Sequence, residues 1–394
     1  MKPVIRRALA NGALVCASVA LVLLLAEAAL RLGGFAYPQF WRPDPLNGGS
    51  LAPGMSGWQT NEGRAYVSIN RQGLRDREHE LAKPPGTYRI AVLGDSFAEA
   101  MQVDLERTFW SLLAPRLEHC GFAPGKRIEA INFGVSGYGT ADELLTLRAR
   151  AWDYQPDMVL LAFYPGNDVR NNSRALEGAP GRAYFVLKDG ELSLDASFRD
   201  LPEFRDKQRI AGQRAFLQDL RLYQLGRRLR AGNVAQKFQN VPVAAAVAAG
   251  ATQLREPGVD ENVFREPAEP AWREAWEVTD RLVAATAGET RAHGARFLLV
   301  VLSTAASVYP DAGMRKRYAE SLGVKSLFYP DEHLERLAAR QGFEVLALAP
   351  QMQRRADATG VPLHGFDNTR RGFGHWNEAG HALAAELIAG RLCP

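Results

Sequence analysis

The sequence lacks the features that mark several large classes of protein. Its 394 residues include only three cysteines, and they contain no internal repeat, no low-complexity tract and no long run of one charge. The formal net charge is +4, from 48 basic and 44 acidic residues, which is too small a surplus to indicate a nucleic-acid-binding protein. With 46% hydrophobic and 23% charged residues, the composition is that of a folded globular protein rather than a disordered one.

Charged residues are also missing from one long stretch near the N-terminus. Three basic residues within residues 1–7 precede an uncharged run over residues 8–26. This run is about long enough to cross a hydrocarbon core of roughly 30 Å as a helix. Positive charge ahead of the run predicts that residues 1–7 are a cytoplasmic tail and that the rest of the chain is exported. We expect residues 8–30 to form a transmembrane anchor.

A cleaved signal peptide is the alternative interpretation of the same stretch. The sequence Ala26-Glu27-Ala28 fits the small-x-small cleavage pattern, but the apolar run is longer than the usual signal core of about 7–15 residues. No lipid-attachment motif surrounds Cys16. Under either interpretation the bulk of the protein lies outside the cytoplasm.

Five short apolar runs predict buried strands, and helical patterns lie between or after them. The runs cover residues 89–94, 128–133, 157–163, 296–302 and 343–349, and the helical patterns cover residues 104–119, 140–154, 271–293, 331–341 and 377–392. Strands that alternate with helices predict an α/β fold with a parallel sheet covered on both faces. Five strands suit the doubly wound order 2-1-3-4-5.

Two regions fall outside this alternation. Residues 31–87 are rich in Pro, Gly and Asn, with a short strand and a turn expected within residues 65–76; we interpret them as a connector that packs on the main domain, residues 88–394. A large insertion, about residues 170–270, follows the third strand, at an edge of the sheet where loops carry function.

Within the insertion, residues 213–232 predict one amphipathic helix with leucines on one stripe and arginines around it. We interpret this helix as a cap with a solvated basic face. The alternative is contact with anionic lipid or an acidic glycan. Residues 241–251 are apolar but too short to span a membrane.

Four stretches stand after predicted strands or just before the last helix. They are "GDS" at residues 94–96, "NFGVSG" at residues 132–137, "PGND" at residues 165–168 and "GHWNEAGH" at residues 374–381. Parallel strands bring their carboxyl ends to one edge of the sheet, which is where ligands bind in open α/β folds. We therefore expect these four stretches to share one site.

The residue types in these stretches suit acyl transfer. Ser96 can act as a nucleophile, and His375 can accept its proton as a general base. The backbone N–H groups of Ser96 and Gly137, with the side-chain amide of Asn167, can hold an oxyanion.

In these four blocks the sequence resembles the SGNH (GDSL-type) hydrolases, which are named for Ser, Gly, Asn and His. The blocks map in family order onto Ser96, Gly137, Asn167 and His375. The resemblance implies a flavodoxin-like three-layer α/β/α sandwich and an esterase, lipase, thioesterase, or carbohydrate O-acetyl esterase or transferase. It implies no metal and no organic cofactor. The segment "SINRQGLRD" before the first strand resembles the lead-in of membrane-anchored bacterial members, which implies a single-pass inner-membrane protein with a periplasmic catalytic domain.

The sequence departs from the family pattern at the acid. The acid of the family usually lies three residues before the histidine, and that position is Gly372 here. The nearest carboxylate upstream is Asp367, which we expect to orient His375. The alternative is a Ser–His dyad in which a backbone carbonyl orients the imidazole. A smaller departure is Pro165, where the third block usually has glycine.

Other polar residues near these blocks have structural interpretations. We expect Asp95 to brace the turn, Asp168 to be structural, His364 to be a loop residue and His381 to pack on a helix face. Trp376 is expected either to line an acyl pocket or to pack in the core.

The predicted topology also pairs two cysteines. With right-handed crossovers, the first and last helices share one face of the sheet. Cys120 lies just past the first of these helices and Cys393 just past the last, so we predict a disulfide between them, which suits an oxidising exported compartment.

Together these observations predict an exported serine esterase that acts on an ester or an acylated carbohydrate, with the membrane as its other partner. Water or a sugar hydroxyl could resolve the acyl-enzyme, so esterase and O-acyltransferase both stay open. The rival hypothesis is a non-catalytic envelope protein that binds a glycan or another partner, and the glycine at position 372 is its best support.

Overall fold

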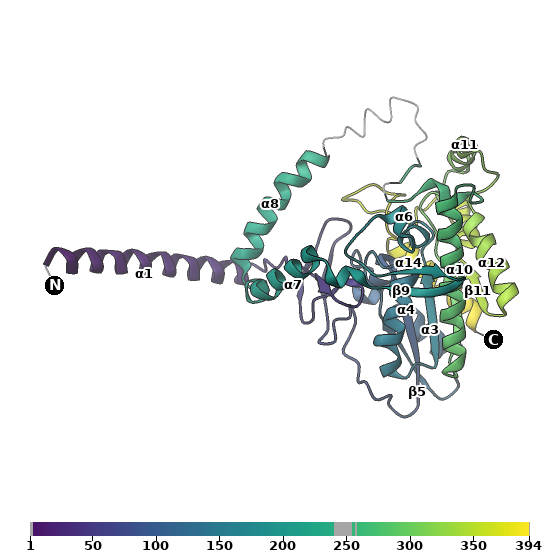
Figure 1. Cartoon of the computed structure of the whole chain (residues 1–394), viewed down its shortest axis with the longest axis horizontal. Coiled ribbons are helices and arrows are strands. Elements are labelled where there is room, and N and C mark those ends of the chain that lie inside the picture. The colour runs from purple at the N-terminus through teal and green to yellow at the C-terminus, as the bar shows by residue number, and fades with distance from the viewer. Residues whose placement is uncertain (1–2, 240–253, 257, 394) are drawn as a thin grey trace.

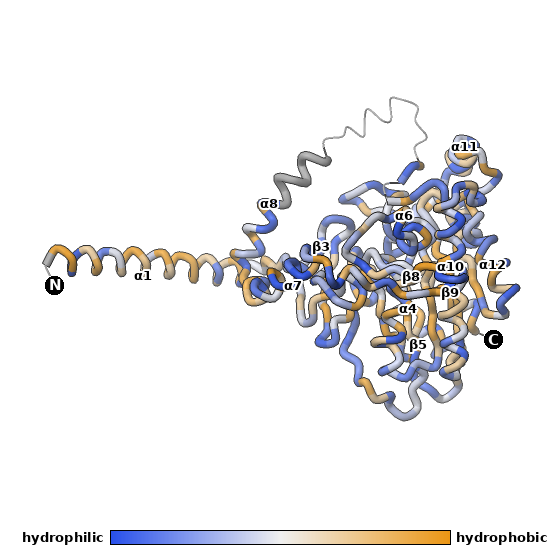
Figure 2. Tube along the Cα trace, in the orientation of Figure 1, coloured by the Kyte–Doolittle hydropathy of each residue, from blue (hydrophilic) through white to orange (hydrophobic). Residues whose placement is uncertain are grey.

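A computed structural model describes residues 3–239, 254–256 and 258–393. The apolar segment at residues 241–251 therefore lies outside the described residues. Helix α1 (Pro3–Leu32) extends away from the main body and is hydrophobic along most of its length (Figures 1 and 2). Among the described residues it holds the one stretch, Val4–Leu32, that is long and apolar enough to cross a bilayer.

The main body is built on one parallel sheet of five strands. They are β5 (Thr87–Gly94), β6 (Arg127–Asn132), β7 (Met158–Phe163), β10 (Arg296–Val301) and β11 (Glu344–Ala347). They lie in the order β6-β5-β7-β10-β11, which is 2-1-3-4-5 in chain order. The central strand β7 is buried at every position, which explains why its sequence is a continuous apolar run rather than an alternating one.

Helices cover both faces of this sheet. Ile90 and Val92 of β5 face a cluster formed with α3 (Phe109–His119), α13 (Ala349–Thr359) and α14 (Glu378–Leu392). Ala91 and Leu93 point to the opposite face, because side chains alternate along a strand. That face packs on helices α4 (Thr140–Ala149), α10 (Pro270–Ala292) and α12 (Tyr329–Gln341). The expected three-layer α/β/α fold is confirmed.

Several helix boundaries differ from the predicted ones. Ser96 begins a helix of only four residues, α2 (Ser96–Glu99), which is followed by Ala100 with φ 51°. A 3₁₀ turn, η1 (Leu105–Arg107), precedes α3, and another, η2 (Ala151–Tyr154), follows α4. Helix α11 (Ala312–Leu322) was not expected from the sequence.

The connector folds into two antiparallel hairpins, β1 (Trp41–Asp44) with β2 (Gly48–Leu51), and β3 (Ser56–Gln59) with β4 (Ala65–Ser68). Its buried side chains, such as Phe40 and Val67, pack against Met101 and Val135. These two partners lie in the loops that follow β5 and β6, so the connector covers the carboxyl edge of the sheet.

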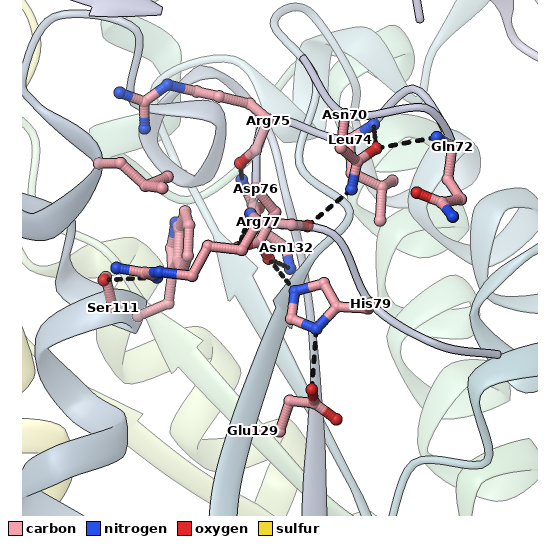
Figure 3. A network of polar contacts seen from close by, with 12 residues as sticks. Asn70, Gln72, Leu74, Arg75, Asp76, Arg77, His79, Ser111, Glu129 and Asn132 are labelled. Carbon is pink, nitrogen blue, oxygen red and sulfur yellow. Dashed lines mark hydrogen bonds and ion pairs between the residues drawn. The ribbon is translucent and has the colours of Figure 1, made fainter. Parts of the chain in front are cut away.

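A polar network fastens the end of the connector to β6 (Figure 3). Buried His79 lies between Glu129, 3.0 Å from Nδ1, and Asp76, 3.1 Å from Nε2. The other side of the network is Asn132, whose backbone N–H donates to Asp76 (2.8 Å) and whose Oδ1 accepts from the N–H of Gly134 (2.9 Å). The connector is thereby linked to the glycine-containing loop after β6.

The insertion contains both strands and helices. Its elements are α5 (Asp168–Asn171), α6 (Arg174–Glu177), β8 (Tyr184–Lys188), β9 (Glu191–Asp195), η3 (Ser197–Asp200), α7 (Pro202–Arg214), η4 (Ala215–Leu217), α8 (Arg221–Gln239) and η5 (Glu261–Phe264). The expectation of one helix over residues 213–232 is wrong. A separate helix begins at Arg221, where the carboxylate of Glu27 in α1 accepts the backbone N–H groups of Arg221 and Leu222, each at 2.9 Å, and so caps its first turn.

The structure contains the disulfide expected from the topology. Helices α3 and α14 lie side by side on one face of the sheet, and Cys120 and Cys393, just past their ends, are bonded with their Cα atoms 5.9 Å apart. The remaining cysteine, Cys16, is free and exposed on α1.

Candidate active site

Ser96 stands at the carboxyl end of the central part of the sheet, on the sharp turn between β5 and α2. Asp95 caps this turn, since its Oδ1 accepts the backbone N–H of Phe97 at 2.9 Å. Ser96 is partly exposed, while its neighbours in the turn are buried. The turn therefore presents the hydroxyl of Ser96 at the surface of a rigid frame.

His375 lies in the loop before α14 and faces Ser96. Its Nε2 is 2.8 Å from the Oγ of Ser96. The ring of Phe97 packs against the imidazole with centroids 5.0 Å apart. Two residues that are 279 positions apart in sequence thus have the geometry of a nucleophile and its general base.

The carboxylate beside His375 is Glu62, and the expectation that Asp367 fills this role is wrong. Glu62 lies between β3 and β4 in the connector, and its Oε2 is 2.5 Å from Nδ1 of His375. Its Oε1 accepts the backbone N–H of His375 at 2.8 Å. Asp367 instead pairs with Arg371 at 2.6 Å, and its side chain is 83% exposed. An exposed i,i+4 ion pair satisfies Asp367 locally, which leaves it no role at the imidazole.

The loop that carries His375 is shaped to receive Glu62. Gly374 has φ +81°, and a Cβ at this position would lie 2.2 Å from the Oε1 of Glu62, so a larger residue would strain the backbone and displace the carboxylate. Asn368 forms hydrogen bonds with the tip of the β3–β4 hairpin. Its Oδ1 accepts the N–H of Gly63 at 2.9 Å, and its Nδ2 donates to the carbonyls of Thr60 (3.1 Å) and Gly63 (2.8 Å).

Glu62 and His375 each favour the charged form of the other. Burial disfavours the charged form of His375, but the hydrogen bond and negative charge of Glu62 outweigh burial and raise the pKa of the imidazole. Burial likewise opposes ionisation of Glu62, while its hydrogen bonds from His375 and the charge of the imidazolium lower its pKa. The pair therefore favours an ionised carboxylate beside an imidazole of increased basicity.

Gly137 and Asn167 lie on the loops after β6 and β7, next to the turn of Ser96. Gly137 is exposed and has φ +81° with open space where a Cβ would stand, so its conformation rather than crowding calls for glycine. Asn171 holds the carbonyl of Gly137 at 3.3 Å. Asn167 donates from Nδ2 to Oδ2 of Asp95 at 3.3 Å, and the Oγ of Ser96 lies 3.3 Å from the same atom. Asp95 thus orients two members of the predicted site.

Glu99 links the nucleophile turn to the loop of Gly137. It is fully buried three residues after Ser96, and its carboxylate accepts the hydroxyl of Ser136 and the indole N–H of Trp41, the latter at 2.9 Å. Burial raises the pKa of Glu99 to about 7. Trp41 comes from the connector, so a second connector residue reaches the site.

A second buried carboxylate, Glu256 of the insertion, supports the loop of His375. Its Oε1 accepts the backbone N–H of Gly374 at 2.7 Å. Burial is the main reason that its pKa rises to about 7. Its charge when ionised adds to that of Glu62 in raising the pKa of His375.

The remaining polar residues near the site have structural roles. The backbone N–H of Tyr164 donates to buried Asp168 at 2.8 Å. His364 donates from Nδ1 to the carbonyl of Gly374 at 2.6 Å, and burial lowers its pKa to about 4. His381 stacks on Phe109, and burial lowers its pKa to about 3. Trp376 is fully buried, so it packs in the core and does not line a pocket.

Sequence reasoning placed four site residues but missed the carboxylate. Glu62 is an isolated acid in a short hairpin, 313 positions from His375, and no spacing rule connects the two. The available signal was the alternating pattern of residues 65–68, which marks one arm of that hairpin. Among the residues that the structure describes, no cluster of three or more His, Cys, Asp or Glu side chains is arranged to hold a metal ion.

Comparisons with known proteins give likenesses of low identity. No family model and no curated protein matches the chain. Among solved structures, it is similar to the acetyl xylan esterase AlAXEase, with 12% identity, 77% of this chain and 98% of that chain covered, and a TM-score of 0.37. It is similar to TesA, with 15% identity, 77% and 97% covered, and a TM-score of 0.37. It is also similar to a catalytic mutant of Axe2, an acetylxylan esterase from Geobacillus stearothermophilus, with 10% identity, 79% and 96% covered, and a TM-score of 0.39. At these values the likenesses assign no substrate to the chain.

Proposed function

We propose that the protein is a serine esterase of the SGNH type, with Ser96, His375 and Glu62 as its catalytic triad. One observation carries the proposal: the Oγ of Ser96 lies 2.8 Å from Nε2 of His375, and Nδ1 of the same ring lies 2.5 Å from the carboxylate of Glu62. This chain of contacts activates a hydroxyl and fixes the tautomer of the base.

The mechanism follows from these positions. Nε2 of His375 takes the hydroxyl proton as the Oγ of Ser96 attacks the acyl carbon. Glu62 accepts the Nδ1–H of His375 and stabilises the imidazolium that forms. The N–H groups of Ser96 and Gly137, with Nδ2 of Asn167, are the donors we assign to the oxyanion. His375 then returns the proton to the leaving alkoxide, and a second hydroxyl compound releases the acyl group from Ser96.

The identity of that second compound separates hydrolysis from transfer. Water gives an esterase, and a sugar hydroxyl gives an O-acyltransferase; the triad and oxyanion donors serve both. Product analysis with an acyl donor, in the presence and absence of added carbohydrate, distinguishes them, since only transfer yields an acylated sugar.

We also propose that the protein is exported and anchored in the membrane by α1. The apolar helix with basic residues before it supports an anchor whose N-terminus is cytoplasmic. The Cys120–Cys393 disulfide supports an oxidising compartment for the main domain. N-terminal sequencing of the membrane-extracted protein tests the anchor, because a chain that begins near residue 29 would instead establish signal cleavage.

The test of the enzyme proposal is covalent labelling with a fluorophosphonate probe, combined with turnover of p-nitrophenyl acetate by the full chain. We expect the label on Ser96 and no label in Ser96→Ala. A wild-type protein that is folded but takes no label would favour the rival class, a non-catalytic binding protein.

A further inference from the structure

Two hollows outside the triad are both lined by Trp41. The smaller, of about 310 Å³, is lined by Gly137 and Ser136 of the predicted oxyanion loop and by Trp41. The larger, of about 640 Å³, lies between the connector hairpin that contains Trp41 and the α7–α8 segment. Both volumes are in the range of ligand sites, about 300–1,000 Å³. Trp41 lines both hollows, and Gly137 of the predicted oxyanion loop lines the smaller one.

The larger hollow is positively charged. Its lining includes Arg42, Lys207 and Arg214, and no aspartate or glutamate. All three cations are exposed, and none of them forms an ion pair with a carboxylate of the described residues, although many arginines of this chain do. On α7 itself, Arg205 and Arg209 are paired with Asp200 and Asp206. Three cations around one hollow without neutralising acids favour an anionic ligand.

The other lining residues of the larger hollow combine groups that suit a sugar with apolar side chains. Aromatic rings (Trp41, Tyr223) and side-chain amides (Gln39, Gln208, Gln218) line the larger hollow, together with seven apolar residues: Pro43, Ala52, Pro53, Met55, Ile210, Ala211 and Ala215. Flat rings and amides suit sugar rings and their hydroxyls.

Polar side chains also line the smaller hollow. Asn47, Asp142 and Arg182 line it, and each has one buried side-chain atom without a hydrogen-bond partner among the described residues. Its other walls include the backbone of Gly48, Gly49 and Gly181. A ligand in this hollow would therefore meet polar side chains beside Gly137.

We propose that these hollows form one binding cleft for an acidic glycan, with the ester-bearing sugar beside Gly137 and negatively charged sugars against Arg42, Lys207 and Arg214. The position of the ester rests on the proposed function, whereas the binding of an acidic glycan does not. Trp41 joins the two parts of the cleft, and its hydrogen bond to Glu99 connects it to the loop of Gly137.

The experiment measures binding rather than turnover. Full-length Ser96→Ala protein in neutral detergent is titrated by calorimetry with a galacturonate hexamer, a heparin hexasaccharide, neutral maltohexaose, inorganic phosphate and short-chain phosphatidylglycerol. We expect at least one acidic hexasaccharide to bind about tenfold or more tightly than maltohexaose and phosphate, and to lose that advantage in about 1 M salt, where the Debye length is about 3 Å.

Matched variants locate the site. The triple variant Arg42→Gln, Lys207→Gln, Arg214→Gln is expected to weaken binding about tenfold or more. The control Arg205→Gln, Arg209→Gln, on the same helix but ion-paired, should change binding by less than about twofold, as is usual for exposed pairs. Circular dichroism and the thermal midpoint show that each variant is folded.

Several results would overturn the inference: no binding of either acidic hexasaccharide, equal binding of maltohexaose, tighter binding of phosphatidylglycerol, or equal losses in the triple variant and the control. The proposed function fails independently of these, through the absence of Ser96 labelling or of p-nitrophenyl acetate turnover in the wild-type chain.

Discussion

The sheet domain and the connector contribute to the candidate site in different ways. The sheet domain places Ser96, Gly137 and Asn167 on the turn and loops that follow the adjacent parallel strands β5, β6 and β7. The connector places Glu62 and Trp41 through side-chain contacts made by the tips and edges of two small hairpins. A catalytic set can thus combine residues fixed by a regular sheet with residues from an appended segment that only tertiary contacts hold in place.

The largest expected effect concerns the sheet domain. Ser96→Ala removes the nucleophile, and we expect p-nitrophenyl acetate turnover to fall by at least about 10³-fold, toward the residual rate that binding and oxyanion donors alone support. The stability of the variant should be close to that of the wild type, measured by urea unfolding. Turnover that survives this substitution would mean that the triad is not the catalytic centre.

The next effect measures the contribution of the connector. Glu62→Gln is expected to reduce kcat/KM by about 10²–10⁴-fold, because the imidazolium loses its counter-charge and the imidazole its fixed tautomer. Asp367→Asn is the matched control and should leave kcat/KM within about twofold. If Asp367→Asn were the damaging variant, the assignment of Glu62 would be wrong.

The pH dependence of kcat/KM tests the interaction between Glu62 and His375. Glu62 raises the pKa of His375, and the base must be neutral to act, so wild-type kcat/KM should fall on the acid side at a pH above the ordinary histidine value of about 6.5. In Glu62→Gln that acid limb should move to lower pH. A limb at the same pH in both proteins would show that Glu62 does not govern the titration of His375.

A smaller effect is expected at the contact between the two regions. Asn368→Ala removes three hydrogen bonds to the hairpin tip that carries Glu62, which corresponds to a loss of about 1–3 kcal/mol. We expect kcat/KM to fall about 5–100-fold, with the acid limb shifted toward that of Glu62→Gln. The neighbouring Thr369→Val serves as the control, and equal losses in both variants would indicate a general disturbance of the loop.

The smallest effect is on stability. His79 joins the connector to β6, and despite the opposing effect of burial its pKa is raised by hydrogen bonds and charges from Asp76 and Glu129. A raised pKa in the folded state stabilises the protein fully below the unfolded value of about 6.5 and loses this contribution as pH rises through the folded-state pKa. We expect His79→Gln to lower the free energy of unfolding by about 1–2 kcal/mol at pH 5.5, and by less at pH 9. A difference that is constant between these two pH values would contradict this account.

The fold was largely predictable because it repeats one pattern. Continuous apolar runs such as residues 157–163 and the helices between them define a parallel sheet, and the carboxyl ends of its strands gather Ser96, Gly137 and Asn167. The topology also brought Cys120 and Cys393 together. What could not be predicted depends on contacts without a local signature. Glu62 reaches His375 from a hairpin tip, and Glu27 of α1, far away in sequence, caps the start of α8 at Arg221.

The junction between α1 and α8 has a consequence for the reach of the site. Glu27 and Arg31 in the last turns of α1 bind the start of α8, and the chain is buried again at Ala36, so only residues 33–35 separate helix and domain. In the anchored form this short connection would keep the domain close to the membrane. The distance that Ser96 can reach from the bilayer would then be limited. The distance of an ester from the membrane surface would therefore affect substrate choice alongside its chemistry.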